Sequence, residues 1–288
     1  MRIPESELII NQDGSIYHLN VLPEDIATTV IFVGDPARVP KVSKYFDSIE
    51  IKKTKREFVI HTGILNKKRI TVLSTGMGTD NIDIVMNELD ALFNVDFVNR
   101  TIKQNLTSLD IIRIGTSGAA QPDIEIDSFL ASKMAIGLDG LMGFYQTEKS
   151  IQDEKILTKI QTITGNLGIT ACLTHAATSL LDSLAYDMKK GITLTNTGFY
   201  GPQGRSIRLA PKNVHFIDEL VKLELPLNQK ITNLEMETSG IYGLSTLLGH
   251  RAISLNAILA NRAKGTFTKN ANVVIDQLIQ QTLERIAH

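Results

Sequence analysis

Three short segments of the chain place glycine beside polar or charged residues directly after an apolar run. The first is VIFVGDPARV, where Gly34 lets a ligand approach the backbone and Arg38 falls in the first turn of an expected helix. Backbone N–H groups at a helix start and a guanidinium both attract an oxyanion such as phosphate. Taken alone, the segment is more typical of a plain strand-to-helix turn.

The second segment, VLSTGMGTDN, carries two glycines in a strand-to-helix turn. It lacks the lysine of a Walker loop and the complete glycine pattern of a dinucleotide fingerprint, which argues against ATP and NAD. A ligand-facing loop and a simple tight turn both remain open interpretations.

The third segment, IIRIGTSGAAQP, is more informative because Arg113 interrupts an apolar strand. A buried arginine is costly unless it meets an anion. We therefore expect either an internal carboxylate or a bound phosphate to pair with Arg113.

Two later segments offer groups suited to a sugar and a base. In NLEMET, the carboxylate of Glu237 can accept hydrogen bonds from two hydroxyls, and Glu235 either assists it or orients the turn. In FYGPQGR, Gln203 offers a donor and an acceptor, and Arg205 offers a positive fork. Read alone, NLEMET would be interpreted as an exposed helix start, and FYGPQGR as a glycine-rich loop with a solvated arginine.

Composition limits the classes of protein that remain. The 288 residues include 43% hydrophobic and 21% charged residues, which is enough to bury a sizeable core. With a net charge of −1, the chain has no excess of positive charge that would attract nucleic acid or an anionic membrane. The lone Cys172 excludes an intrachain disulfide, and the polar start does not resemble a signal peptide, so we expect a cytoplasmic protein.

Along the chain, apolar runs of strand length alternate with segments of helical period. This pattern predicts an α/β fold with a parallel or mixed sheet. We expect a single domain over residues 1–288. Expected strands are Thr29–Val33, Phe58–Ile64, Arg69–Ser74, Ile111–Ile114, Phe129–Ala135, Gly191–Thr195 and Ala252–Leu259. Expected helices are Val39–Phe46, Asn81–Phe93, Ile151–Leu167, Ser179–Lys189, Lys212–Leu223, Ser239–Leu247 and Asn272–Ile286.

Six short motifs of the chain occur in the order found in the nucleoside phosphorylase family. They are GDPARV, STGMG, RIGTSGA, FYGPQGR, NLEMET and LANR. The chain resembles this family from about His18 to Ile286. The resemblance implies a three-layer α/β/α sandwich with a mixed central sheet, and a site for a nucleoside and inorganic phosphate at the strand ends. It implies no cofactor other than phosphate as co-substrate. It also implies a homodimer as the minimal active unit, with a hexamer as a larger assembly.

The resemblance assigns roles to individual residues. The phosphate-binding positions are Gly34, Arg38, Arg56, Arg113 and Thr116. The ribose-binding positions are His18, Thr116, Met236 and Glu237, and the base-binding positions are Ser117, Gly118, Phe199, Gln203 and Arg205. Arg113, Glu237 and Arg205 are the implied catalytic residues. Arg56 and His18 match residues that cross a subunit interface, so a monomer would lack a complete site.

Within the family, the chain is most similar to the uridine branch. Purine-specific relatives use an aspartate at the end of the late strand, whereas this chain has Ala260-Asn261-Arg262. The expected reaction is phosphorolysis of uridine to uracil and ribose 1-phosphate. The alternatives are a phosphorylase of a purine nucleoside or a deoxypyrimidine nucleoside, and a non-catalytic nucleoside-binding protein on the same fold. No metal is expected, although Glu57 matches the carboxylate of a potassium site in some members.

Overall fold

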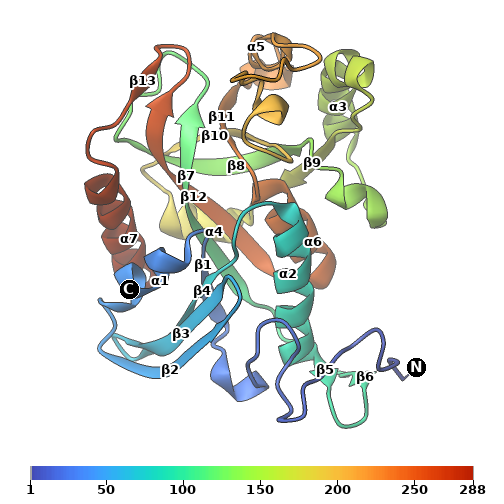
Figure 1. The fold of residues 1–288 in the computed structure, drawn as a ribbon, viewed down its shortest axis with the longest axis vertical. Helices are drawn as coiled ribbons and strands as arrows, with labels where there is room; N and C mark the ends of the chain where they lie inside the picture. The colour runs from blue at the N-terminus through green and yellow to red at the C-terminus, as the bar shows by residue number, and fades with distance from the viewer. Residues whose placement is uncertain (1, 288) are drawn as a thin grey trace.

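The computed structural model describes residues 2–287 and contains a mixed sheet of eleven strands surrounded by helices (Figure 1). Its main path runs β13 (Thr266–Phe267), β12 (Arg251–Asn261), β8 (Phe129–Gly137), β10 (Lys189–Thr195), β11 (Ile231–Glu235), β7 (Asp110–Ala119), β1 (Thr29–Val33), β4 (Lys68–Ser74), β3 (Phe58–Leu65) and β2 (Ser48–Lys55). The short β9 (Cys172–His175) pairs with β8. Both parallel and antiparallel pairs occur along this path, which confirms the expected mixed sheet.

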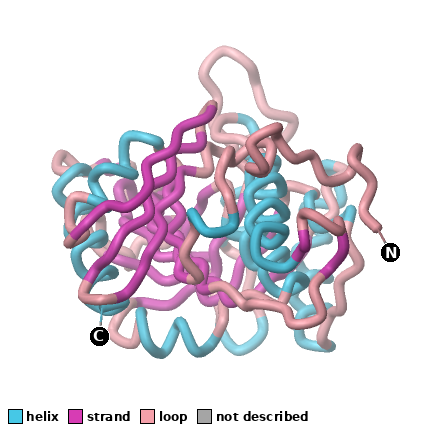
Figure 2. The backbone as a smooth tube through the Cα atoms, turned by 90° about the horizontal axis from the view of Figure 1, so that it is seen from below, coloured by secondary structure: helices cyan, strands magenta, loops and turns pink. Residues whose placement is uncertain are grey.

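Both faces of the central strands are buried, as their continuous apolar sequences predict. In β1, Val30 and Phe32 face one hydrophobic core, whereas Ile31 and Val33 face another. The first core contains α2 (Thr79–Asn94) and α6 (Thr238–Leu248). The second contains α1 (Val39–Ser43), α4 (Thr178–Leu184) and α7 (Ala271–Ala287), so helices cover the strands on both sides (Figure 2).

A third core lies at the far end of the sheet, beneath α3 (Ile151–Thr164) and α5 (Phe216–Val221). Its apolar residues come from these helices and from β8, β10 and β11. The polar segment before Asp110 is a surface excursion that forms the small hairpin β5 (Val95–Asp96) and β6 (Thr101–Ile102).

Part of the sheet closes on itself. Strand β12 pairs in parallel with β7 along ten positions and antiparallel with β8. Because β8, β10, β11 and β7 are joined in that order, the five strands β7, β12, β8, β10 and β11 form a closed ring. We call this set the strand ring. It brings residues that are distant in the sequence to one small region.

Most expected elements lie where the sequence places them, and β1 has its predicted bounds. The predicted helix Ser179–Lys189 is wrong in its second half, because α4 ends at Leu184 and Lys189 already begins β10. Similarly, the helix predicted over Lys212–Leu223 is shortened to α5, and the one predicted over Val39–Phe46 to α1.

Six strands of the described chain were not predicted, and three of them, β5, β6 and β13, are only two residues long. Strand β2 is a charged edge strand, SIEIKKTK, which has no apolar face to indicate it. Strands β9 and β11 are only four and five residues long, and their pairing to distant strands decides their conformation. None of the helices in residues 2–287 has the length and apolar character needed to cross a membrane.

Candidate active site at the strand ends

The centre of the candidate site is a buried cluster of charges around Arg113 of β7. Its Nη2 lies 2.6 Å from Oε2 of Glu237 and 3.2 Å from Oε2 of Glu235. Its Nη1 donates to Oδ1 of Asn256 at 3.1 Å and to Oγ of Ser254 at 3.2 Å. Of the two anions left open by the sequence, the structure therefore shows the internal carboxylates.

Gly115 makes room for this arrangement. It lies two residues beyond Arg113 on the same strand, and therefore on the same face. A Cβ at this position would overlap Nη1 of Arg113 and lie 2.5 Å from Cζ. The glycine thus allows the guanidinium to fold back over its own strand, toward the carboxylates.

Glu235 and Glu237 hold the turn that joins β11 to α6. Oε2 of Glu235 accepts hydrogen bonds from the backbone N–H groups of Glu237 and Thr238, both at 2.9 Å. Glu235 thus orients the turn, which is one of the two roles that the sequence left open. Oε1 of Glu237 accepts from the backbone N–H of Gly78 at 2.8 Å. This bond links the β11 end to the glycine loop after β4.

The electrostatics reflect the mutual burial of these groups. Burial alone would lower the pKa of Arg113, but the charges of Glu235 and Glu237 outweigh it and raise that pKa above its ordinary value. Burial raises the pKa of Glu235, although Arg113 opposes the rise. Burial and the charge of Arg113 lower the pKa of Arg38. Arg38 therefore lies close enough to Arg113 for the two cations to repel each other.

Arg38 reaches this cluster from the loop after β1. Asp35 caps the short 3-10 turn Pro36–Arg38 by accepting from the N–H of Ala37 at 2.9 Å. Nη1 of Arg38 donates to the carbonyl of Ile114 at 3.3 Å, which directs the side chain toward β7. A Cβ on Gly34 would lie 3.3 Å from the carbonyl of Gly76, so the loops after β1 and β4 are in contact.

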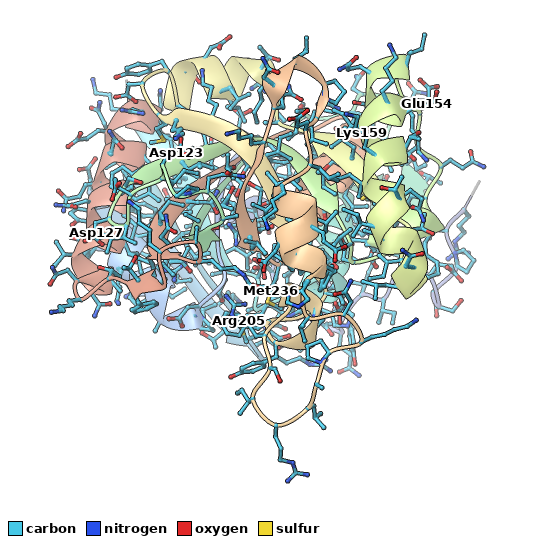
Figure 3. All side chains as sticks on the ribbon, turned by 90° about the horizontal axis from the view of Figure 1, so that it is seen from above. Asp123, Asp127, Glu154, Lys159, Arg205 and Met236 are labelled. Atoms are coloured by element: carbon cyan, nitrogen blue, oxygen red, sulfur yellow. The ribbon has the colours of Figure 1, made fainter. Side chains whose placement is uncertain are left out.

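The expected base-binding loop is built around Arg205. Its guanidinium stacks on the ring of Phe199 at 3.9 Å, donates to the Phe199 carbonyl at 2.7 Å and also donates to Oε1 of Gln203. Nη1 of Arg262 donates to the Gln203 carbonyl at 2.7 Å, which ties the loop to the end of β12. Figure 3 shows the segment that carries Arg205 extending from the body of the molecule.

The remaining positions that the resemblance assigns to the base and sugar lie on β7 and in the turn after β11. The hydroxyl of Ser117 points inward, because it donates to the Leu234 carbonyl at 2.9 Å and accepts from Nδ2 of Asn233 at 2.8 Å. Thr116, Gly118 and Met236 are partly exposed and are accessible to a ligand.

His18 and Arg56 lie apart from the charge cluster in the described chain. Nδ1 of His18 contacts Oε1 of Glu88 at 2.6 Å. Glu88 lies about 14 Å along α2 from the helix start at Thr79. Arg56 is exposed in the turn between β2 and β3, with a φ of 54°. Neither side chain bonds to Arg38, Arg113 or Glu237 within residues 2–287.

Two further sequence expectations concern Glu57 and Cys172. A Cβ on Gly76 would lie 3.1 Å from Cγ of Glu57, which places Glu57 beside the glycine loop. Burial and the charge of Asp139 raise the pKa of Cys172 to about 12. The thiol is therefore protonated at neutral pH and unsuited to act as a nucleophile.

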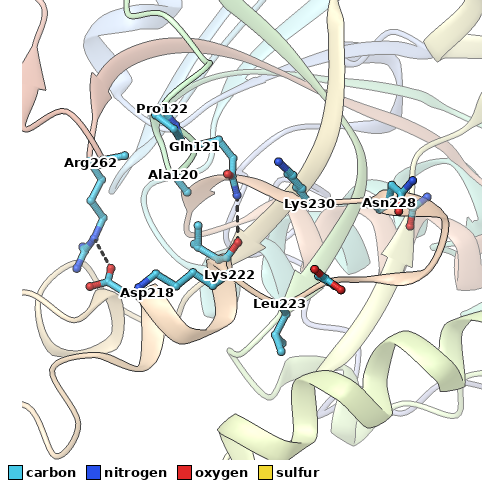
Figure 4. A pocket seen from close by; sticks show the side chains of 13 residues that line it. Ala120, Gln121, Pro122, Asp218, Lys222, Leu223, Asn228, Lys230 and Arg262 are labelled. Carbon is cyan, nitrogen blue, oxygen red and sulfur yellow. Dashed lines mark hydrogen bonds and ion pairs between the residues drawn. The ribbon is translucent and has the colours of Figure 1, made fainter.

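One cavity lies beside Arg262 rather than over the charge cluster. It measures about 800 Å³ and is lined by residues such as Gln121, Asp218, Lys222 and Arg262 (Figure 4). Neither Arg113 nor Glu237 contributes to it. We place the candidate site at the charge cluster, because that is where the buried charged groups converge.

Sequence reasoning missed three residues of the cluster: Gly115, Ser254 and Asn256. Ser254 and Asn256 interrupt a largely apolar strand, and their spacing of two residues was the available signal. Two polar residues at that spacing share one face of a strand. This face can be linked to Arg113 only once β12 is known to pair with β7.

The chain is similar in sequence to known proteins over most of its length. A model of the phosphorylase superfamily matches residues 28–287. A uridine phosphorylase of Thermococcus kodakarensis is 32% identical over 259 residues, which cover 90% of this chain and 82% of that protein. A DeoD-type purine nucleoside phosphorylase of Bacillus velezensis is 24% identical over 243 residues, covering 83% of this chain and 84% of that protein.

A solved structure extends the likeness to three dimensions. The crystal structure of a Trypanosoma brucei nucleoside phosphorylase, described as showing uridine phosphorylase activity, has a TM-score of 0.87 and 30% sequence identity. The likeness covers 96% of this chain and 98% of that chain. The chain belongs to the phosphorylase superfamily.

Proposed function

We propose that this protein is a uridine phosphorylase, which converts uridine and inorganic phosphate to uracil and ribose 1-phosphate. The observation that carries the proposal is the pairing of buried Arg113 with Glu237. The loop of Gln203 is bonded to Arg262 at the end of β12, the strand whose Asn256 holds Arg113. The family implies phosphate as co-substrate. The named activities of the Thermococcus and Trypanosoma proteins support uridine as the nucleoside.

In this proposal, Glu237 binds the ribose diol and the arginines bind phosphate. The bonds from Arg113 and Gly78 fix the carboxylate of Glu237, so its remaining acceptor positions have a defined direction. Arg38 has no ion pair in the described chain, and its charge is available to a dianion. Gly34 and Thr116 complete the phosphate site, and Met236 packs against the sugar.

The reaction needs little besides positioning and charge stabilisation. An oxygen of phosphate forms a bond to C1′ of the ribose while the C1′–N1 bond breaks, and the bonding electrons leave with uracil. Arg205 and Nε2 of Gln203 stabilise the negative charge that develops on the departing base. Phe199 covers the site, and Ser117 and Gly118 line the strand beneath the base.

A second subunit completes the proposed site. His18 and Arg56 lie away from the charge cluster of their own chain, and both side chains are at least partly accessible. We propose that a homodimer lends His18 to the ribose and Arg56 to the phosphate of the neighbouring site. In the same proposal, Glu57 is the candidate ligand for a potassium ion at the interface.

The first test of the proposal is uracil release from uridine, measured with and without inorganic phosphate, with inosine and thymidine assayed in parallel. We expect cleavage of uridine that depends on phosphate, and no cleavage of inosine. Preferred cleavage of inosine would instead support a purine phosphorylase, the activity named for the Bacillus relative. Absence of all cleavage would indicate a nucleoside-binding protein.

The base-binding role is tested by replacing Arg205 with alanine. Loss of the guanidinium removes charge stabilisation at the base, so kcat/KM for uridine should fall by roughly 100-fold. The KM for phosphate should change much less. The matched control is Arg208→Ala, because Arg208 is an exposed arginine of the same loop. Equal uridine kinetics in the two variants would refute the assignment.

The geometry of Arg113 is tested without deleting its charge, by Gly115→Ala. The new methyl group would occupy the space of the guanidinium and displace it from Glu237. We expect phosphorolysis to fall by about 100-fold or more. The control is Gly143→Ala, because a Cβ there would meet no atom within 4 Å. Circular dichroism would establish that both variants fold. Normal activity of folded Gly115→Ala would show that this position of Arg113 is unnecessary.

A further inference from the structure

A belt of hydrogen bonds between side chains runs around the interior of the strand ring. It begins at Arg113 and returns to the same strand at Ser117, and each of the four other strands contributes one residue. The bonds are Arg113 to Asn256 at 3.1 Å, Asn256 to Ser132 at 3.0 Å, Ser132 to Thr193 at 2.5 Å, Thr193 to Asn233 at 2.9 Å and Asn233 to Ser117 at 2.8 Å.

The direction of this belt is determined by its two ends. A guanidinium can only donate, so the belt must start with Arg113 donating to Oδ1 of Asn256. At the other end, Ser117 donates to the Leu234 carbonyl, which can only accept. Thr193 donates its single hydroxyl proton to Oδ1 of Asn233. In the bond between Ser132 and Thr193, the donor must therefore be Ser132. Every donor in the belt therefore points the same way.

The belt is also fully buried. Asn256, Ser132, Thr193 and Asn233 each have 0% exposure, and their bonded atoms are all satisfied. Burying polar side chains gives up their hydration, and apolar residues would fill the same interior without that cost. A fully satisfied network does, however, fix its members in one arrangement. The fold alone therefore does not account for the belt.

We propose that this belt is a positioning device that fixes Arg113, at the phosphate and ribose end of the site, relative to Ser117, at the base end. Asn256 holds Nη1 of Arg113 with a neutral acceptor, which orients the guanidinium without neutralising more of its charge. Asn233 lies near the end of β11 and donates a hydrogen bond to Ser117, which connects that end of β11 to β7. Asn256, Ser132, Thr193 and Asn233 are positioning residues that touch no substrate. The inference rests on the proposed function for its kinetic consequence.

The test interrupts the belt at its middle, at Thr193, which is hydrogen-bonded to neither Arg113 nor Ser117. Thr193→Val removes the hydroxyl and keeps the shape, whereas Thr193→Ser keeps the hydroxyl. The matched control is Thr62→Val, since Thr62 is also a fully buried strand threonine and shares a 2.7 Å hydroxyl bond, with Thr71, outside the belt. We expect Thr193→Val to lower kcat/KM for both uridine and phosphate by about ten-fold. Thr193→Ser and Thr62→Val should remain within about two-fold of the parent protein.

A second measurement does not depend on turnover. The side-chain amide NMR resonances of Asn256 and Asn233 should shift in Thr193→Val and stay in place in Thr62→Val. Unshifted amides would overturn the belt itself. Shifted amides with kinetics equal to those of Thr62→Val, or equal losses in Thr193→Ser and Thr193→Val, would overturn its positioning role. If the parent protein lacked phosphorolysis altogether, the proposed function would fail, and the amide resonances would still decide whether the belt exists.

Discussion

A buried positive charge on the central strand is the constraint around which the site is organised. Arg113 lies in an apolar strand with little access to water, where an unpaired guanidinium would be strongly destabilising. Two carboxylates compensate it, one from the last residue of β11 and one from the turn that follows. The absence of a side chain at Gly115 leaves room for the guanidinium of Arg113 in this position. The residues that we propose to be catalytic therefore also hold the structure together in this part of the molecule.

This constraint also explains how separate loops share one site. Glu237 bonds to Gly78, so the compensating carboxylate also holds the glycine loop after β4. Arg38 approaches the same charges from the loop after β1 and raises the local positive potential. The loop of Gln203 and Arg205, which we propose to bind the base, is anchored independently, through Arg262 at the end of β12. Under the proposed function, changes in that loop would alter base choice while the charge cluster stays intact.

Local sequence patterns predicted the elements and the main charged residues. Continuous apolar runs revealed β1, β4 and β7, and the break in one run singled out Arg113. The sequence could not choose between a carboxylate and a phosphate as its partner, because Glu237 is 124 residues away and meets Arg113 only in the folded chain. Ser254 and Asn256 were missed for the same reason. Their role depends on closure of the strand ring, which no local pattern encodes.

The most direct test of this account is a crystal structure of the protein with phosphate and a non-cleavable uridine analogue. The account predicts the ribose diol on Glu237, with the Arg113–Glu237 pair retained, and phosphate between Arg38 and Arg113. The uracil ring should meet Gln203 and Arg205. Binding of the analogue in the cavity lined by Asp218 and Lys222, with the charge cluster left unoccupied, would contradict the account.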